Sequence, residues 1–445
     1  MPRWTKDLNV TLRGMTRTTE RAAHRRGVGY FLPALFVDRF SHMGGIDRGV
    51  FERQLAGCRS FEDEPWTNYW RAFADEQIKS AEVCLVRMGG PTTAELLDRG
   101  NDEVVDRLRN LLSPVARLFA DRTRRSAAAF VADHPDDADA VTAVDALVKA
   151  ITYLFAAAWP GWTSRRLAAY ADSRRVFDVL ATALAPALGV EVEKFVLDIG
   201  DDAVSGCAIL PAHVEKAPAI LITNGLEGTI EEIALPAMHH RPPDTALFLM
   251  EMPGTFSYRQ PMSTNSERHY RAVIDHMATH PRVDAERLGM MGISFGAHWS
   301  TRMAWRDNRL KAVVSNGGPY HRAFAPAASF GMAEIMTSTL EKTTGARNPL
   351  DLGRRLKTLS LREHYREISV PILATNGDSD TLVPTQDTVD LAYGAPRGEL
   401  KLYPHDDHCA MGHYDQTMAE ATSWLQHQLG ARGHAPRRGR SKSAS

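Results

Sequence analysis

The chain has 445 residues, of which 44% are hydrophobic and 24% charged, and its formal net charge is −1. This length exceeds what one hydrophobic core usually holds, so it predicts two domains. The balanced charge offers no overall attraction to nucleic acid. Four scattered cysteines form neither a disulfide framework nor a zinc pattern, which favours free thiols in the cytoplasm; they are Cys58, Cys84, Cys207 and Cys409.

The first 27 residues are rich in arginine and are expected to form a flexible basic leader. The next apolar run, residues 30–37, is short and is broken by Pro33, so it is a poor signal peptide. An organellar transit peptide is the alternative, since acidic residues are few there. No apolar run approaches the roughly 18 residues of a membrane span. We therefore expect no membrane partner.

Residues 28–190 carry apolar residues every three or four positions, which predicts a helical domain. Three such stripes lie near residues 104–119, 141–155 and 165–188, and Pro114 is expected to interrupt the first of them. Aromatic residues concentrate in segments 64–70 and 159–162. We expect these rings to fill the helical core, and the alternative is that some of them line a substrate pocket.

After Gly189 the pattern changes to short apolar strands that alternate with helical segments. Residues 192–211 predict a β-hairpin with its turn at 200–202. Strands are expected at 217–223, 245–251, 288–291, 310–315, 370–375 and 399–403. This alternation predicts an α/β fold with a mostly parallel sheet over residues 191–430. Residues 320–367 interrupt the alternation and are long enough for a lid or insertion, and residues 431–445 predict a disordered tail.

A short apolar strand leads into Gly292-Ile293-Ser294-Phe295-Gly296, and a helix-compatible run follows. This arrangement resembles the nucleophile elbow of α/β-hydrolases, in which a strained turn raises a serine hydroxyl above the sheet. The glycines are needed because the turn leaves no room for side chains beside it. Ser294 is therefore the candidate nucleophile.

A serine hydroxyl needs an imidazole to take its proton and a carboxylate to orient that imidazole. In this fold the acid and then the histidine follow the serine along the chain. Asp380 lies in an acidic loop after a buried strand, and the resemblance to the hydrolase pattern Gly-x-x-Asp-x-x-Val-Pro selects it as the candidate acid. Asp378 is expected to shape the loop. His408 is the candidate base, and His405 and His413 remain alternatives.

The oxyanion requires backbone donors, for which we expect the N–H groups of Phe295 and Leu226. Glu227 and Glu231 also invite a catalytic interpretation, but acids at a helix start are the commoner explanation. His298 is expected to pack or cap rather than react. A metal site built from residues 405–409 is a weaker alternative, because no recognised ligand spacing is present.

Together these motifs resemble the α/β-hydrolases that carry an N-terminal helical domain. That group includes 2,6-dihydroxypseudooxynicotine hydrolase, the fungal pigment hydrolases that shorten polyketides, and esterases of the fermentation–respiration switch type. The likeness rests on segments 224–228, 252–255 and 292–296, on Asp380 with residues 383–384, and on residues 408–409. The resemblance implies that the helical domain covers the active site, that no cofactor or metal is needed, and that the enzyme is a homodimer.

We therefore interpret the chain as a cytoplasmic serine hydrolase that uses Ser294, His408 and Asp380. Its expected substrate is a small molecule with either an ester or the C–C bond of a β-diketone or acyl-phenol. One alternative is a peptidase or acyltransferase with the same triad. The other is a catalytically silent binding protein on this fold.

Overall fold

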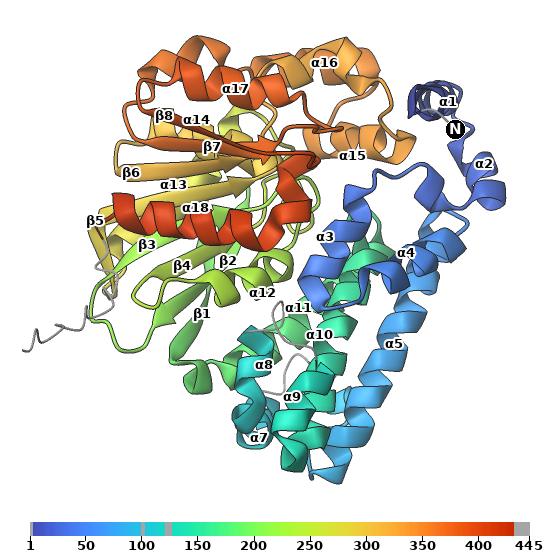
Figure 1. Cartoon of the computed structure of the whole chain (residues 1–445), viewed down its shortest axis with the longest axis vertical. Helices are drawn as coiled ribbons and strands as arrows, with labels where there is room; N and C mark the ends of the chain where they lie inside the picture. The colour runs from blue at the N-terminus through green and yellow to red at the C-terminus, as the bar shows by residue number, and fades with distance from the viewer. Residues whose placement is uncertain (1–2, 99–102, 121–126, 431–445) are drawn as a thin grey trace, which may run out of the picture.

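The computed structural model describes residues 3–98, 103–120 and 127–430, and its elements divide into a helical region and a sheet region (Figure 1). The described helices before the sheet are α1 (Arg3–Met15), α2 (Thr19–Arg26), α3 (Leu35–Gly44), α4 (Arg48–Gly57), α5 (Asp63–Arg87), α6 (Thr93–Leu97), α7 (Glu103–Leu112), α8 (Ala116–Ala120), α9 (Ala127–Asp133), α10 (Ala138–Ala158) and α11 (Ser164–Leu184). A 3-10 turn at Ser113–Val115 separates α7 from α8, which confirms the interruption predicted at Pro114.

The expectation of a flexible leader over residues 1–27 is corrected by α1 and α2. Both helices have a buried side, because Val10, Ala22 and Ala23 are almost fully enclosed. Helix α1 also packs on α15 (Glu334–Thr344), as Figure 1 shows. The Thr11 hydroxyl oxygen accepts a hydrogen bond from the Gly331 N–H at 2.8 Å. Apolar residues at helical spacing therefore anchor this basic segment despite its charge.

Helices α5, α10 and α11 pack against one another and form the centre of the helical region. The aromatic residues Trp66, Trp70 and Trp159 are fully buried there, which confirms that these rings fill the core. The segment Pro135–Ala158 differs from the sequence expectation, because it is long and apolar enough to cross a membrane by those two criteria. Its most apolar window is 83% buried inside the structure, as in a core helix.

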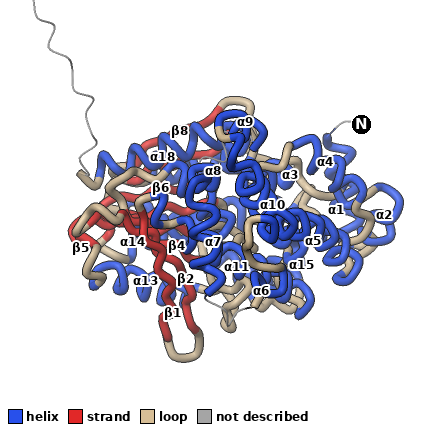
Figure 2. Tube along the Cα trace, turned by 90° about the horizontal axis from the view of Figure 1, so that it is seen from below, coloured by secondary structure: helices blue, strands red, loops and turns tan. Residues whose placement is uncertain are grey.

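Within the part of the chain that the structure describes, the sheet has eight strands in the order β1-β2-β4-β3-β5-β6-β7-β8. Strands β1 (Val190–Asp198) and β2 (Ala203–Pro211) form the predicted hairpin, which projects from one edge of the sheet in Figure 2. The other strands are β3 (Ala217–Thr223), β4 (Ala246–Met250), β5 (Val283–Ile293), β6 (Leu310–Asn316), β7 (Ile372–Gly377) and β8 (Gly398–Tyr403). From β4 to β8 neighbouring strands are parallel, so the predicted α/β class is confirmed.

Helices cover both faces of the sheet: α12 (Ile230–His240), α13 (Glu267–Thr279), α14 (Phe295–Arg306), α17 (Thr385–Gly394) and α18 (Tyr414–Gln428). Successive side chains of a strand point to opposite faces of the sheet. Ile220 and Ile222 belong to the same core as α12, α18 and the helical region, whereas Leu221 belongs to the core of α13 and α14. The helical region thus packs on the α12–α18 face.

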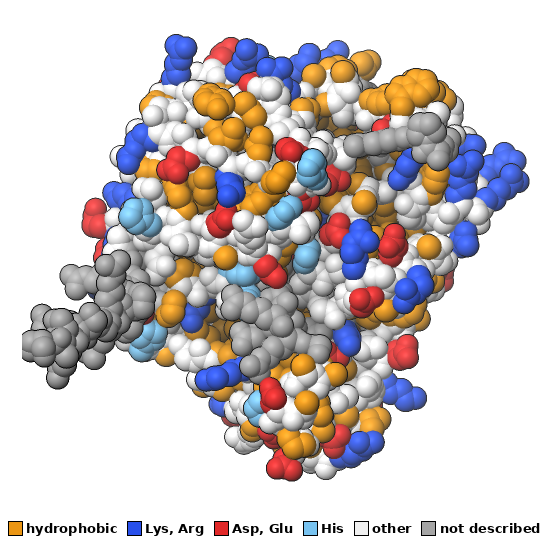
Figure 3. Space-filling view, viewed as in Figure 1, with side chains coloured by type: hydrophobic (Ala, Val, Ile, Leu, Met, Phe, Trp, Pro, Cys, Tyr) orange, Lys and Arg blue, Asp and Glu red, His pale blue; other side chains and the backbone are white. Residues whose placement is uncertain are grey.

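Residues 320–367 form 3-10 turns and two helices, α15 and α16 (Pro349–Thr358). The expected tail, residues 431–445, lies outside the described residues. On the face shown in Figure 3, acidic and basic side chains intermingle over most of the surface, in keeping with the net charge of −1.

Candidate active site

Ser294 lies in the sharp turn between β5 and α14, with φ 56° and ψ −126°. Neighbouring glycines make the turn sterically feasible. A Cβ at Gly292 would lie 2.1 Å from the Gly296 carbonyl oxygen, and one at Gly296 would lie 2.5 Å from the carbonyl oxygens of Thr223 and Asn224. A non-glycine residue in this conformation is strained, and such strain gathers at functional sites. The predicted elbow is therefore present.

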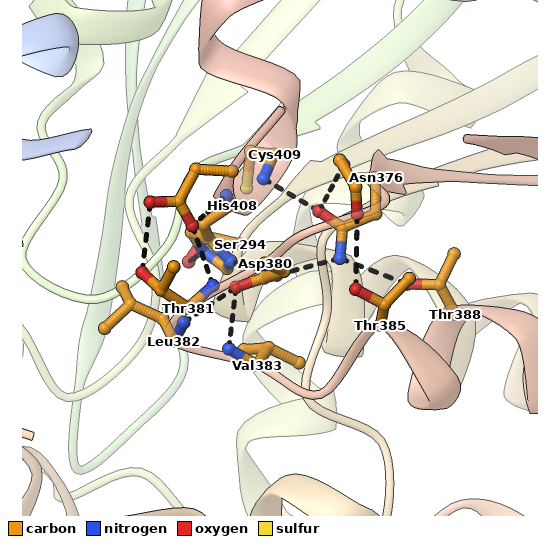
Figure 4. A network of polar contacts seen from close by, with 12 residues as sticks. Ser294, Asn376, Asp380, Thr381, Leu382, Val383, Thr385, Thr388, His408 and Cys409 are labelled. Atoms are coloured by element: carbon orange, nitrogen blue, oxygen red, sulfur yellow. Dashed lines mark hydrogen bonds and ion pairs between the residues drawn. The ribbon is translucent and has the colours of Figure 1, made fainter. Parts of the chain in front are cut away.

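Three side chains from separate loops meet at this turn (Figure 4). His408 Nε2 lies 2.8 Å from Ser294 Oγ, and His408 Nδ1 lies 2.8 Å from Asp380 Oδ2. The His408 and Asp380 side chains are 3% and 0% exposed, so water competes little for these contacts. The arrangement is that of a serine, an imidazole and an orienting carboxylate.

His408 and Asp380 shift each other's pKa values in opposite directions. Burial alone would raise the pKa of Asp380, but His408 and hydrogen bonds from the Val383 N–H and the Asn376 amide lower it overall. Burial would likewise lower the pKa of His408, yet the neighbouring negative charge of Asp380 raises it well above the usual value. The pair therefore favours an ionised carboxylate beside an imidazole with increased basicity.

Two side chains join the loop of Asp380 to the loop of His408. Asn376 donates to Asp380 Oδ2 at 2.8 Å and accepts from the Cys409 N–H at 2.9 Å. Asp407 Oδ1 accepts from the N–H groups of Thr381 and His408 at 2.7 and 2.8 Å. Cys409 has a positive φ of 59°, which turns the chain sharply after the histidine. These contacts hold the imidazole toward Ser294.

The structure separates the alternative histidines from Ser294. The backbone N–H of His405 donates to Asp378 Oδ1 at 2.9 Å, so Asp378 shapes the loop, as expected. His413 Nδ1 lies 2.8 Å from Asp406 Oδ2.

His298 is buried and packs, with Nδ1 3.0 Å from the Pro319 carbonyl oxygen. Among the described residues, no group of three or more His, Cys, Asp or Glu side chains is arranged to hold a metal ion.

The backbone groups expected to hold an oxyanion border Ser294. Phe295 is the first residue of α14, so its N–H has no acceptor within the helix. A Cβ at Gly225 would lie 2.6 Å from Ser294 Cβ, which shows how closely this loop approaches the serine. Leu226 follows at the tip of a turn in which the Gly228 N–H donates to the Gly225 carbonyl at 3.2 Å.

The two carboxylates after Leu226 have different roles. Glu231 lies in the first turn of α12, as expected of an acid at a helix start. Glu227 departs from that expectation because it precedes the helix, is 2% exposed and has a φ of 55°. Its Oε2 accepts the Gly161 N–H at 2.6 Å. Glu227 therefore connects this loop to the helical region.

A cavity of about 90 Å³ lies beside Ser294 and His408. Its lining includes residues of α3, α12, α15 and α18, so the helical region and the 320–367 segment both contribute to it; among them are Phe36, Arg39, His42, Glu232, Met336 and Tyr414. The sequence analysis did not identify these lining residues. Phe36, Arg39, His42 and Met336 lie far from the motifs along the chain, whereas Glu232 and Tyr414 follow them closely. Packing brings all of them beside the serine.

The sequence of the chain also matches a known protein family. The sequence profile described as "Esterase FrsA-like" matches residues 125–430, which is more than half of the chain. Esterase FrsA of Vibrio parahaemolyticus serotype O3:K6 is 25% identical over 231 residues, which cover 49% of this chain and 55% of that protein. The chain thus spans about half the length of this curated relative.

Solved structures show the same fold. The 2,6-dihydroxy-pseudo-oxynicotine hydrolase has a TM-score of 0.61 at 18% identity, and the match covers 89% of this chain and 95% of the other. AbyA5 has a TM-score of 0.56 at 20% identity, over 72% of this chain and 94% of its own. At these identities the two likenesses concern the fold alone.

Proposed function

We propose that this chain, which belongs to the FrsA-like esterase family, hydrolyses carboxylic esters with Ser294 as nucleophile, His408 as general base and Asp380 as the orienting carboxylate. The chain is a hydrolase of the α/β-hydrolase type. The observation that supports these residue roles is the unbroken line of contacts from Ser294 Oγ through the His408 ring to Asp380, each 2.8 Å long.

In the proposed reaction, Ser294 Oγ attacks the ester carbonyl carbon while His408 Nε2 takes the hydroxyl proton. The N–H groups of Phe295 and Leu226 stabilise the oxyanion that forms. His408 then gives the proton to the departing alcohol, which leaves an acyl group on Ser294. Water, deprotonated by the same imidazole, releases the acid and restores the serine. Asp380 keeps the Nδ1–H directed toward itself, so that Nε2 is free to accept the proton.

An ester is the bond that family membership favours. The sequence analysis left open a C–C bond of a β-diketone or acyl-phenol. Cleavage of that bond also requires stabilisation of a carbanion leaving group, and the family description names an esterase. Hydrolysis of para-nitrophenyl esters and of aryl β-diketones, measured side by side, tests this choice. Cleavage of the diketones without hydrolysis of the esters would contradict the assignment of an ester substrate.

Labelling with a fluorophosphonate probe tests the residue roles. We expect the wild type to label and Ser294→Ala to remain unlabelled. Among the histidine variants, His408→Ala should label at least about a thousandfold more slowly. His405→Ala and His413→Ala are matched controls and should label at nearly the wild-type rate. Equal labelling of Ser294→Ala and wild type would refute the proposed nucleophile.

A further inference from the structure

The cavity beside Ser294 is mainly apolar and offers few side chains that can hydrogen-bond to a substrate. Its apolar lining includes Pro33, Leu35, Phe36, Met43, Met336 and Met411. Arg39 and Glu232 also line it, but they form an ion pair with each other, with one contact of 2.8 Å. Their polar groups are thus already largely satisfied.

Tyr414 brings a hydrogen-bond donor to this cavity. It is the first residue of α18 and lines the cavity together with Ser294 and His408. Its hydroxyl has no hydrogen-bond partner among residues 3–98, 103–120 and 127–430. Burial, and then the nearby charge of Glu232, raises the pKa of the hydroxyl, so the phenol stays protonated. Glu232, whose charge acts on the hydroxyl, lines the same cavity.

His42 brings a hydrogen-bond acceptor to the same cavity. Its Nε2 lies 2.7 Å from the Met411 carbonyl oxygen. A carbonyl oxygen only accepts, so Nε2 carries the hydrogen and Nδ1 of the neutral ring is an acceptor. Within the described part of the chain, Nδ1 has no hydrogen-bond partner. The His42 ring stacks on the Tyr414 ring, with centroids 4.7 Å apart and an interplanar angle of 15°.

We propose that the Tyr414 hydroxyl and His42 Nδ1 form a paired subsite that selects ester substrates carrying a hydroxyl group. A hydroxyl both accepts and donates, so it can take the Tyr414 hydrogen and give its own to His42. An alkyl group at that place would leave both protein groups unpaired in an apolar cavity, which is unfavourable. This proposal rests on the ester hydrolysis proposed above, because Tyr414 and His42 contact the substrate held at Ser294.

The experiment compares two matched pairs of esters. Para-nitrophenyl butyrate and its β-hydroxy derivative place the hydroxyl on the acyl side, and phenyl and para-hydroxyphenyl butyrate place it on the leaving group. For each pair, the ratio of kcat/KM with and without the hydroxyl is divided by the ratio of the alkaline hydrolysis rates. We expect the wild type to prefer the hydroxylated ester by about tenfold in at least one pair, the size of one or two net hydrogen bonds.

Tyr414→Phe removes one oxygen atom and keeps the stacked ring, so the preference should fall close to unity. His42→Phe keeps the stack, removes the acceptor and should also reduce the ratio. Tyr393→Phe is the matched control, since Tyr393 is 80% exposed and does not line the cavity, and it should retain the wild-type ratio.

A wild type without preference in either pair would overturn the subsite, as would a Tyr414→Phe variant that keeps the wild-type ratio. If the wild type hydrolyses none of the four esters and its Ser294 takes no fluorophosphonate, the proposed function fails, and the subsite fails with it. If Ser294 takes the fluorophosphonate but the wild type shows no preference for the hydroxylated esters, only the subsite fails.

Discussion

Glu227 Oε2 accepts the Gly161 N–H at 2.6 Å, and this bond joins the turn beside Ser294 to the linker between α10 and α11. The same residue is tied at its backbone, because its carbonyl oxygen accepts from Arg39 at 3.1 Å. Glu227 holds a positive φ of 55° directly after Leu226. The helical region therefore helps to fix the conformation of the loop that presents the Leu226 N–H.

The first prediction concerns stability as a function of pH. Burial raises the pKa of Glu227 to about 7 from its ordinary value of 4.5. Between about pH 4.5 and pH 7 the folded protein therefore keeps a proton on Glu227 that the unfolded chain has released. The free energy of unfolding falls as pH rises through this range. Glu227→Gln keeps an oxygen acceptor for Gly161 but cannot titrate. Relative to wild type, it should gain free energy of unfolding as pH rises from about 4.5 to about 7, measured in urea titrations.

Glu227→Ala is the companion variant, because it leaves the Gly161 N–H without its partner. Relative to Glu227→Gln, which does not titrate either, we expect it to lose about 1–3 kcal/mol of stability at every pH. Glu251 also has a pKa raised to about 7 by burial, but it is present in all three proteins and cancels in the comparison. Parallel pH profiles for wild type and Glu227→Gln would contradict the assignment.

The second prediction concerns the pH dependence of ester hydrolysis. Asp380 raises the pKa of His408 above 6.5, and the neutral imidazole is the form that acts as a base. kcat/KM should therefore rise with pH through an apparent pKa above 6.5. Asp380→Asn should shift this pKa downward and lower kcat by about 10⁴-fold. A profile that falls as pH rises through this range would exclude His408 as the base.

The third prediction tests the Leu226 N–H as an oxyanion donor. Leu226 is the second residue of a turn closed from Gly228 to Gly225, with a positive φ at the third residue, and proline suits this second position. Leu226→Pro removes the N–H while keeping the turn, so kcat should fall about 10²–10³-fold. Leu226→Ala retains the donor and should lose much less. Similar kcat values for the two variants would contradict the role.

The fourth prediction concerns the space in front of Ser294. Gly225→Ala would place its Cβ 2.6 Å from Ser294 Cβ and 2.8 Å from Oγ, so the serine must move. We expect kcat to fall about a hundredfold, because a shift of an ångström disrupts attack geometry. Gly353→Ala in α16 is the control, since a Cβ there meets nothing within 4 Å. It should raise the melting temperature slightly through helix propensity and leave kcat unchanged.

Local signals in the sequence were sufficient for most of the sheet region. The hairpin turn at 200–202, the alternating strands and the glycine-flanked Ser294 are patterns set by neighbours along the chain. Each appears in the structure close to its predicted bounds, and Asp378 shapes its loop as expected. The prediction of a flexible leader over residues 1–27 is wrong where α1 and α2 form, because the arginine content does not reveal the buried side that Val10 and Ala22 provide.

The sequence by itself determined the α/β class, the strand–turn–helix around Ser294 and a short set of candidate acids and bases. Only the tertiary structure decided which of His405, His408 and His413 lies 2.8 Å from Ser294 Oγ. It also decided that Glu227 bonds Gly161 and that His42 stacks on Tyr414. These relationships join residues far apart along the chain. They arise when packing buries the faces of separate elements together, which no local sequence pattern encodes.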